Sequence, residues 1–111
     1  MDKAKNHAEP PNYVLKLYIA GMTPRSMNAI ENIREISETY LKGRYHLEII
    51  DLYKNPILAK GEQIIAAPTL IKKLPAPLRR LIGDLSDKEK VLIGLDLVEP
   101  EQASNGAKDQ D

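Results

Sequence analysis

Few side chains of this sequence have the types and the spacing that catalysis or metal binding requires. The chain contains two histidines and no cysteine, so thiolate nucleophiles, thiolate metal sites and disulfides are all excluded. His7 lies in a polar amino-terminal segment, and His46 has only Glu48 beside it, so no convergent metal ligands are evident from the spacing. Asp84 and Asp87 fall in an expected turn, where capping of backbone N–H groups explains them better than acid–base catalysis. The sequence therefore predicts no catalytic site, no metal site and no cofactor.

Basic residues flank a short proline-rich segment. Lys72 and Lys73 precede residues 74–77, and Arg79 and Arg80 follow them. One interpretation is a solvated loop; the other is a small basic docking patch for an acidic partner surface, which would orient a partner more than it would add affinity. The whole chain has 16 basic and 16 acidic residues, so it lacks the basic excess of a nucleic-acid-binding protein. Near-neutral charge also permits self-association.

The elements that must position these residues begin with a strand, a helix and a second strand. Residues 13–20 alternate apolar and polar side chains as a strand does. Thr23 offers an N-cap oxygen and Pro24 suits the first helical position, so a helix is predicted from there to about residue 42. Residues 45–52 form the second strand. A βαβ unit of this kind predicts parallel strands.

The length of 111 residues fits a single domain, which we place at residues 13–98. A second cap-and-proline signature predicts a short helix over residues 56–64. The polar segments 1–12 and 99–111 are expected to be mobile tails. The longest apolar runs are too short to cross a membrane, and the charged amino terminus lacks a secretory signal, so we expect a cytoplasmic protein.

Residues 78–98 support two secondary structures almost equally well. Read as a helix, the second half opens with Ser86 and carries Glu89 three residues later, which is the pattern of a capping box. That helix has one apolar face, made of Val91, Leu92, Leu95 and Val98. Read as a strand, the same stretch has a different apolar face, made of Val91, Ile93, Leu95 and Leu97. The first half is equally ambiguous, because its apolar residues suit either a helix or a short strand that ends in a turn at Gly83 and Asp84.

Gly94 and Asp96 are both poor residues for the late turns of that helix. Glycine there costs roughly 1 kcal/mol against alanine. Asp96 would put negative charge near the negative end of the helix dipole, which is unfavourable by roughly 0.3 to 1 kcal/mol. One interpretation is that these residues hold the helix in a minor population, since two packings of one sequence need differ by only a few kcal/mol. The other is that Gly94 only allows close packing in a strand.

The βαβ start, followed by Pro68 in the run Ala67 to Thr69, resembles the thioredoxin fold. In that fold a proline, commonly cis, faces a pair of redox cysteines at the start of the first helix, so a cis bond before Pro68 is more frequent by analogy than the roughly 5% of proline bonds in general. The corresponding loop here has Met22 and Arg25 at the cysteine positions. Thiol exchange is therefore chemically impossible, and the scaffold would survive without its reaction.

Three motifs carry a further resemblance: LKLYIAG (residues 15–21), AAPTL (66–70) and LIGDLSDKEKVLIGLDL (81–97). They make residues 13–97 similar to the KaiB family of bacterial circadian-clock proteins. The resemblance implies an α/β fold with a thioredoxin-like βαβ amino-terminal half. It also implies a carboxyl-terminal half that switches between a ground-state arrangement, βαββααβ over the whole domain, and a thioredoxin-like one, βαβαββα.

The resemblance also implies residues and partners. Gly94 and Asp96 occupy the family's switch positions, and we assign Ser86, Glu89 and Pro68 to the same switch. Proteins similar to KaiB are not enzymes; their ground state is a tetramer, and their rarer monomeric state binds the first ATPase ring of the KaiC hexamer. In a complete clock that state captures KaiA and displaces a sensor kinase with a thioredoxin-like sensory domain. We therefore expect a KaiC-like ATPase as partner, self-association to a dimer or tetramer, and neither nucleic-acid nor membrane binding.

Several positions are expected to contact partners: Gln63, Lys72, Arg79, Arg80, His46 and Glu48. Gln63 stands where the cyanobacterial relatives carry a lysine. His46 and Glu48 replace an alanine and a lysine in the region that contacts KaiA, and the charge reversal at Glu48 argues against KaiA capture. Two alternatives to a clock regulator remain: a purely structural oligomer, and a stress-response or sensory module that acts on a histidine kinase.

Overall fold

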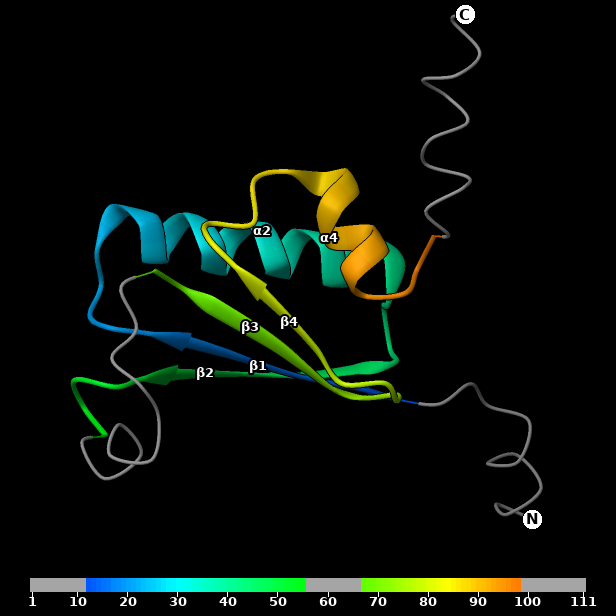
Figure 1. Cartoon of the computed structure of the whole chain (residues 1–111), viewed down its shortest axis with the longest axis horizontal. Helices are drawn as coiled ribbons and strands as arrows, with labels where there is room; N and C mark the ends of the chain where they lie inside the picture. The colour runs from blue at the N-terminus through cyan, green and yellow to red at the C-terminus, as the bar shows by residue number, and fades with distance from the viewer. Residues whose placement is uncertain (1–11, 56–66, 99–111) are drawn as a thin grey trace, which may run out of the picture.

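The computed structural model describes residues 12–55 and 67–98 of the 111-residue chain (Figure 1). Its elements in these ranges are β1 (Tyr13–Ile19), α2 (Pro24–Tyr40), β2 (Tyr45–Asp51), β3 (Thr69–Leu74), β4 (Arg79–Ile82) and α4 (Lys88–Gly94). The helix predicted over residues 56–64 lies outside the described residues, as do Gln63, His7 and nearly all of the two predicted tails.

The four strands form one sheet in the order β2-β1-β3-β4. β1 and β2 are parallel, with Tyr13 opposite Tyr45 and Leu17 opposite Ile49, as the βαβ pattern predicts. β3 runs antiparallel to β1, and β4 runs antiparallel to β3. Figure 1 shows α2 and α4 on the same face of this sheet. These two helices cover the face on which the main core lies, and a second, smaller buried cluster consists of Tyr18, Ile50, Leu52 and Ile71.

The predicted start of α2 is confirmed. Thr23 is its N-cap, the Ser26 backbone N–H donates to Thr23 Oγ1 over 3.1 Å, and Pro24 takes the first helical position. The helix ends at Tyr40, two residues before the predicted end, and Leu41 caps it. The chain then turns through Gly43, whose φ of +78° suits glycine. Local signals of cap, proline and glycine thus define this helix closely.

Residues 78–98 divide between the two predicted structures. The first half contains the strand β4, and the second half contains the helix α4. Gly83 ends β4 with a φ of +123°, which agrees with the predicted turn. Residues 91–97 do not form a strand in this structure. The observed order of elements is that of the thioredoxin-like arrangement, with the stretch between β2 and β3 partly outside the described residues.

The predicted capping box of α4 is wrong. Its N-cap is Asp87, whose Oδ1 accepts the Lys90 backbone N–H over 3.2 Å, so the helix begins one residue later than predicted. The Ser86 N–H instead donates to Asp84 Oδ1 over 3.1 Å, and Glu89 lies in the first turn. Both Ser86 and Asp87 can cap a helix, and the carboxylate of Asp87 interacts more favourably with the positive end of the helix dipole.

The main core lies between the sheet and the two helices. Its fully buried side chains are Leu15, Leu17, Ile33, Leu41, Leu70 and Leu95. Val91, Leu92 and Leu95 are buried and Val98 is partly buried against the same core, so the predicted apolar side chains do pack inward. Leu95 is the cap residue of α4, however, and Val98 lies beyond the end of the helix. Each fully buried side chain contributes roughly 1.5 to 3 kcal/mol relative to an exposed one. α4 is therefore held to the sheet by a few large contacts.

Candidate functional site

The loop between β1 and α2 forms a corner in which Gly21, Met22 and Tyr53 lie together, and we refer to these residues as the β1–α2 corner. Asp51 Oδ1 fixes it by accepting the backbone N–H groups of both Gly21 and Tyr53 over 3.0 Å. Gly21 has a φ of +87°, and a Cβ added to it would lie 3.1 Å from the Tyr53 ring. Met22 is 62% exposed and Tyr53 is 75% exposed. The corner therefore presents apolar surface to the outside.

This corner occupies the place where a thioredoxin-like redox enzyme has its cysteines. Met22 and Arg25 stand there, and the chain contains no cysteine, so it cannot exchange disulfides. Pro68 is buried at the start of β3, as expected of the proline that faces this loop. The bond before Pro68 is trans, however; among the described residues, cis bonds precede Pro75 and Pro77. The chain therefore shares the backbone arrangement of the redox fold but not the cis bond before its proline.

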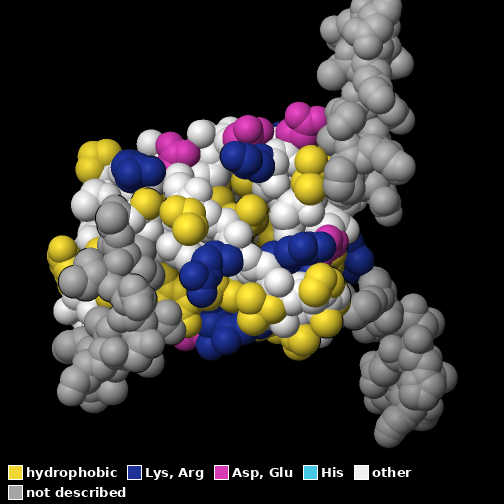
Figure 2. Space-filling view, viewed as in Figure 1, with side chains coloured by type: hydrophobic (Ala, Val, Ile, Leu, Met, Phe, Trp, Pro, Cys, Tyr) yellow, Lys and Arg dark blue, Asp and Glu magenta, His cyan; other side chains and the backbone are white. Residues whose placement is uncertain are grey.

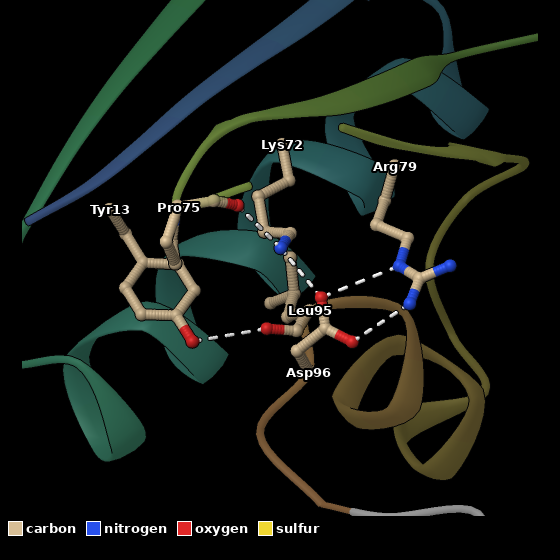
Figure 3. Close-up of polar contacts among 6 residues, drawn as sticks. All are labelled: Tyr13, Lys72, Pro75, Arg79, Leu95 and Asp96. Carbon is tan, nitrogen blue, oxygen red and sulfur yellow. Dashed lines mark hydrogen bonds and ion pairs between the residues drawn. The ribbon is translucent and has the colours of Figure 1, made fainter. Parts of the chain in front are cut away.

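A buried lysine forms the second candidate site (Figure 3). The side chain of Lys72 is 0% exposed, and its Nζ donates to Asp96 Oδ2 over 2.6 Å and to the Pro75 carbonyl oxygen over 2.7 Å. In the regular part of the pairing between β1 and β3, Lys72 lies opposite Leu15; the register shifts only beyond this pair, between Leu15 and Val14. Leu15 belongs to the core, so Lys72 points under the helices. A buried ammonium group requires such partners, because an unpaired buried charge is strongly destabilising.

Asp96 joins this lysine to an arginine of β4. Arg79 donates from Nη2 to Asp96 Oδ1 over 3.1 Å and from Nε to Oδ2 over 3.4 Å. Hydrogen bonds from Arg79 and then from Lys72 hold the pKa of the Asp96 carboxyl below its usual value. We call Lys72, Arg79 and Asp96 the charge cluster.

The cluster corrects the predicted position and cost of Asp96. This residue does not lie in the helix; it follows the cap residue Leu95 and has a φ of +61°, a left-handed conformation that Asp tolerates better than most residues. Its negative charge is still close to the end of α4, but two cations compensate it. The penalty from the helix dipole that the sequence predicts is therefore offset in this arrangement.

One more hydrogen bond ties this end of α4 to the sheet. The hydroxyl of Tyr13, at the start of β1, donates to the Leu95 carbonyl oxygen over 3.1 Å (Figure 3). Burial raises the pKa of Tyr13, which keeps the hydroxyl protonated as a donor. Together with the charge cluster, this bond connects the carboxyl end of α4 to β1, β3 and β4.

The residues that the sequence predicts as partner contacts differ in exposure and in whether their charge is already paired. Lys72 is wrong as a contact in this arrangement, because its side chain is buried and its charge is paired. Arg79 is about half exposed, but Asp96 engages its guanidinium group. Arg80 is exposed and remains a candidate. The pair of adjacent lysines suggests a solvated loop, and nothing in its composition indicates that one of them is buried.

His46 and Glu48 lie exposed on β2, the edge strand opposite β4. Glu48 pairs with Lys16 of β1 at 3.7 Å, with both side chains partly exposed. Its charge is thus partly compensated, which weakens the argument from charge reversal. Gln63 lies outside the described residues.

Gly94 is the last residue of α4 and packs against Leu81 of β4. A Cβ at Gly94 would lie 2.5 Å from Leu81 Cδ2, so the glycine permits a close approach of helix and strand. The alternative that Gly94 only allows close packing in a strand is wrong about the element, because the close approach is at the end of a helix. Its role in switching remains a prediction.

Sequence reasoning missed two contacts at this end of the domain: the Tyr13 hydroxyl bond and the burial of Lys72. The alternation of Leu70 with Lys72 along β3 was an available signal, because it puts both side chains on one face.

Residues 12–55 and 67–98 contain no group of three or more His, Cys, Asp or Glu side chains suited to a metal ion. No helix in them is both long and apolar enough to cross a membrane.

The sheet order, the helices on its face and the corner without cysteines define a thioredoxin-like protein that has no thiol chemistry. Its structure is similar to the N-terminal domain of Synechococcus elongatus SasA, with a TM-score of 0.61 and 22% identity over 83% of this chain and 90% of that one. It is similar also to mitochondrial thioredoxin 3 of Saccharomyces cerevisiae, with a TM-score of 0.60 and 14% identity over 87% of this chain and 89% of that one. These likenesses establish the fold.

The sequence comparisons are more specific. Residues 16–97 match the KaiB domain. The chain is 58% identical over 93 residues to the circadian clock oscillator protein KaiB of Parasynechococcus marenigrum (strain WH8102), which covers 84% of this chain and 89% of that relative. It is 60% identical over 86 residues to the protein of the same name from Prochlorococcus marinus (strain MIT 9312), covering 78% and 82%. The chain belongs to the KaiB family, which confirms the resemblance seen in its motifs.

Proposed function

We propose that this protein is a non-enzymatic circadian-clock regulator that binds the ATPase ring of a KaiC-like protein and modulates its phosphorylation cycle or output. The observation that carries the proposal is membership of the KaiB family over residues 16–97, with relatives named as circadian clock oscillator proteins. The absence of cysteine from the whole chain supports a binding role over a redox one.

The conformation that binds the ring is, in this proposal, the thioredoxin-like one. A ground-state arrangement that assembles as a dimer or tetramer would compete with it, with Gly94 and Asp96 among the residues that set the balance. Two features support a small difference in energy: α4 is short, and residues 78–98 carry patterns for both strand and helix. We propose that the exchange takes place in the cytoplasm.

The surface that we propose for ring binding is the β1–α2 corner. Met22 and Tyr53 project exposed apolar side chains from a backbone that Asp51 holds in place. A fixed, exposed tyrosine is a frequent anchor in protein interfaces, because it buries a large area at little cost in side-chain entropy. Arg80 and the β2 residues His46 and Glu48 lie on other surfaces and are secondary candidates.

A titration tests the proposal. The chain is titrated with a KaiC-like ATPase from the same organism, with and without ATP, and binding is followed by fluorescence anisotropy. Tyr53→Ala should weaken binding by at least about tenfold, the loss of a typical interface anchor. Leu78→Ala is the matched control, because Leu78 is 59% exposed at the β3–β4 hairpin, toward the other end of the sheet. No binding to the ATPase in either condition would contradict the proposed function.

A second candidate is a stress-response or sensor-kinase interaction module without a circadian role. The observation that favours it is the likeness to other thioredoxin-like domains, the N-terminal domain of SasA included, since domains of one shape can compete for one surface. Capture of a histidine kinase in place of the ATPase, from an equimolar mixture of the two purified proteins, would favour this candidate.

A further inference from the structure

The outer edge of β4 is open along its length. β4 is last in the strand order β2-β1-β3-β4, and no strand of residues 12–55 or 67–98 pairs with it on that side. An open edge offers backbone N–H and C=O groups to a further strand. Arg79, Arg80 and Ile82 of β4 are all exposed, and Ile82 is 68% exposed. The edge therefore combines unpaired backbone with both charged and apolar side chains.

A hollow of about 210 Å³ lies beside this edge, on the helix-covered side of the sheet. Leu81, Gly83 and Val91 form apolar parts of its wall, and Arg25 of α2 and Lys90 of α4 stand at it. A strand added next to β4 would direct alternate side chains to the two faces of the sheet. One of its side chains would thus enter the hollow while its neighbours lie near Arg80 and Ile82.

The charges around the edge indicate which kind of peptide segment would bind next to β4. Inside the hollow the charges balance, because Asp84 and Asp87 line it together with Arg25 and Lys90. On the other face of the sheet, Arg80 is exposed on the same side of β4 as Ile82, and no ion pair within the described residues involves it. On the face drawn in Figure 2, Lys and Arg side chains lie among hydrophobic ones. An acidic segment with apolar residues matches this surface.

We propose that the outer edge of β4 binds an extended acidic segment of a partner protein, which adds to the sheet as a fifth strand. An apolar side chain of the segment fills the hollow beside Leu81, and the carboxylates that alternate with it face Arg80 on the opposite side of the sheet. The opposite edge, β2, fits such a segment less well, because Glu48 and Asp51 put negative charge there. The edge contains none of the corner residues Gly21, Met22 and Tyr53, so the inference does not depend on the proposed function.

The test uses the full chain and a short, end-blocked peptide in which Glu and Val alternate. Binding is followed by amide NMR shifts and by anisotropy of a labelled peptide. We expect shifts concentrated on residues 79–83 and a five- to tenfold weaker affinity for Arg80→Glu, since the change replaces an attraction by a repulsion. Arg34→Glu is the matched control, because it makes the same charge change on an exposed position of α2 and should leave the affinity within twofold.

Several results would overturn the inference. These are no binding of the acidic peptide, equal binding of a peptide with Lys in place of Glu, shifts on β2 instead of β4, and equal weakening by the two charge reversals. Binding that survives N-methylation of alternate peptide amides on both registers would exclude strand addition, because that change removes the backbone donors. Ring binding is measured separately, so failure here leaves the proposed function intact.

Discussion

Replacing Gly94 with alanine should stabilise this arrangement less than helix propensity alone predicts, because Leu81 occupies the space of the new methyl group. That methyl would lie 2.5 Å from Leu81 Cδ2 and 2.9 Å from Cδ1. Leu81 is only partly buried, so its side chain can turn away, at about 0.5 to 1.5 kcal/mol if it leaves its preferred rotamer. The gain in helix propensity is about 1 kcal/mol. We therefore expect the two effects to cancel to within about 1 kcal/mol.

A double-mutant cycle separates these effects. Leu81→Ala alone removes a partly buried side chain and should cost about 1 to 2 kcal/mol, less than the cost at a fully buried site. With alanine at position 81, the methyl of Gly94→Ala no longer collides and the full propensity gain of about 1 kcal/mol appears. The double variant should therefore be more stable than the sum of the single changes by about 1 kcal/mol.

Urea unfolding followed by circular dichroism, at one low protein concentration, gives the four free energies of unfolding. Gly43→Ala is the control, since Gly43 has a φ of +78° and nothing within 4 Å of an added Cβ. It should cost about 1 kcal/mol in both backgrounds, from backbone strain alone. Additivity of Gly94→Ala and Leu81→Ala within about 0.3 kcal/mol would refute the packing of α4 on β4 described here.

Three further predictions concern single contacts. Ser37→Ala should raise the free energy of unfolding by about 1 kcal/mol, because the Ser37 hydroxyl is buried without a hydrogen-bond partner among the described residues. Ser26→Ala is the control: it loses the hydrogen bond from Thr23 Oγ1 and should show no such gain. Tyr13→Phe should lower the free energy of unfolding by about 1 kcal/mol through loss of the bond to Leu95, and an unchanged urea midpoint would contradict that bond. Carbon-13 NMR of the Asp96 carboxyl should give a titration midpoint below about 3.9, and Arg79→Ala should raise it. The stabilisation linked to Asp96 is then present above a pH of about 3.9 and is lost as the pH falls through the pKa of Asp96 in the folded state. A titration midpoint at or above about 3.9 would show that the charge cluster does not form.

The amino-terminal half could be predicted from the sequence because its signals are local. Thr23, Pro24 and Gly43 mark the helix ends, and alternation marks β1 and β2, so the parallel βαβ unit follows. The carboxyl-terminal half could not be predicted in the same way. Which of its two patterns forms depends on contacts between distant residues, such as Leu95 with the sheet, and neighbouring candidates such as Ser86 and Asp87 satisfy the same local rule.

The candidate site also has one part that could be predicted from the sequence and one part that could not. The absence of thiol chemistry at Met22 and Arg25 could be read directly from residue types. The charge cluster could not, because it joins Lys72 to Asp96 across 24 positions and depends on where the end of α4 lies relative to β3. The two adjacent lysines are the same residue type, and only the alternation of Leu70 with Lys72 along β3 distinguishes the buried one.

The length of α4 has a consequence for how this segment would leave the sheet. A helix of seven residues is too short to persist in water, where isolated helices below about 12 to 15 residues are marginal. Detachment from the sheet and unwinding are therefore a single event for this segment. A segment released in this way would expose its backbone groups at once, which would make them available for new pairings.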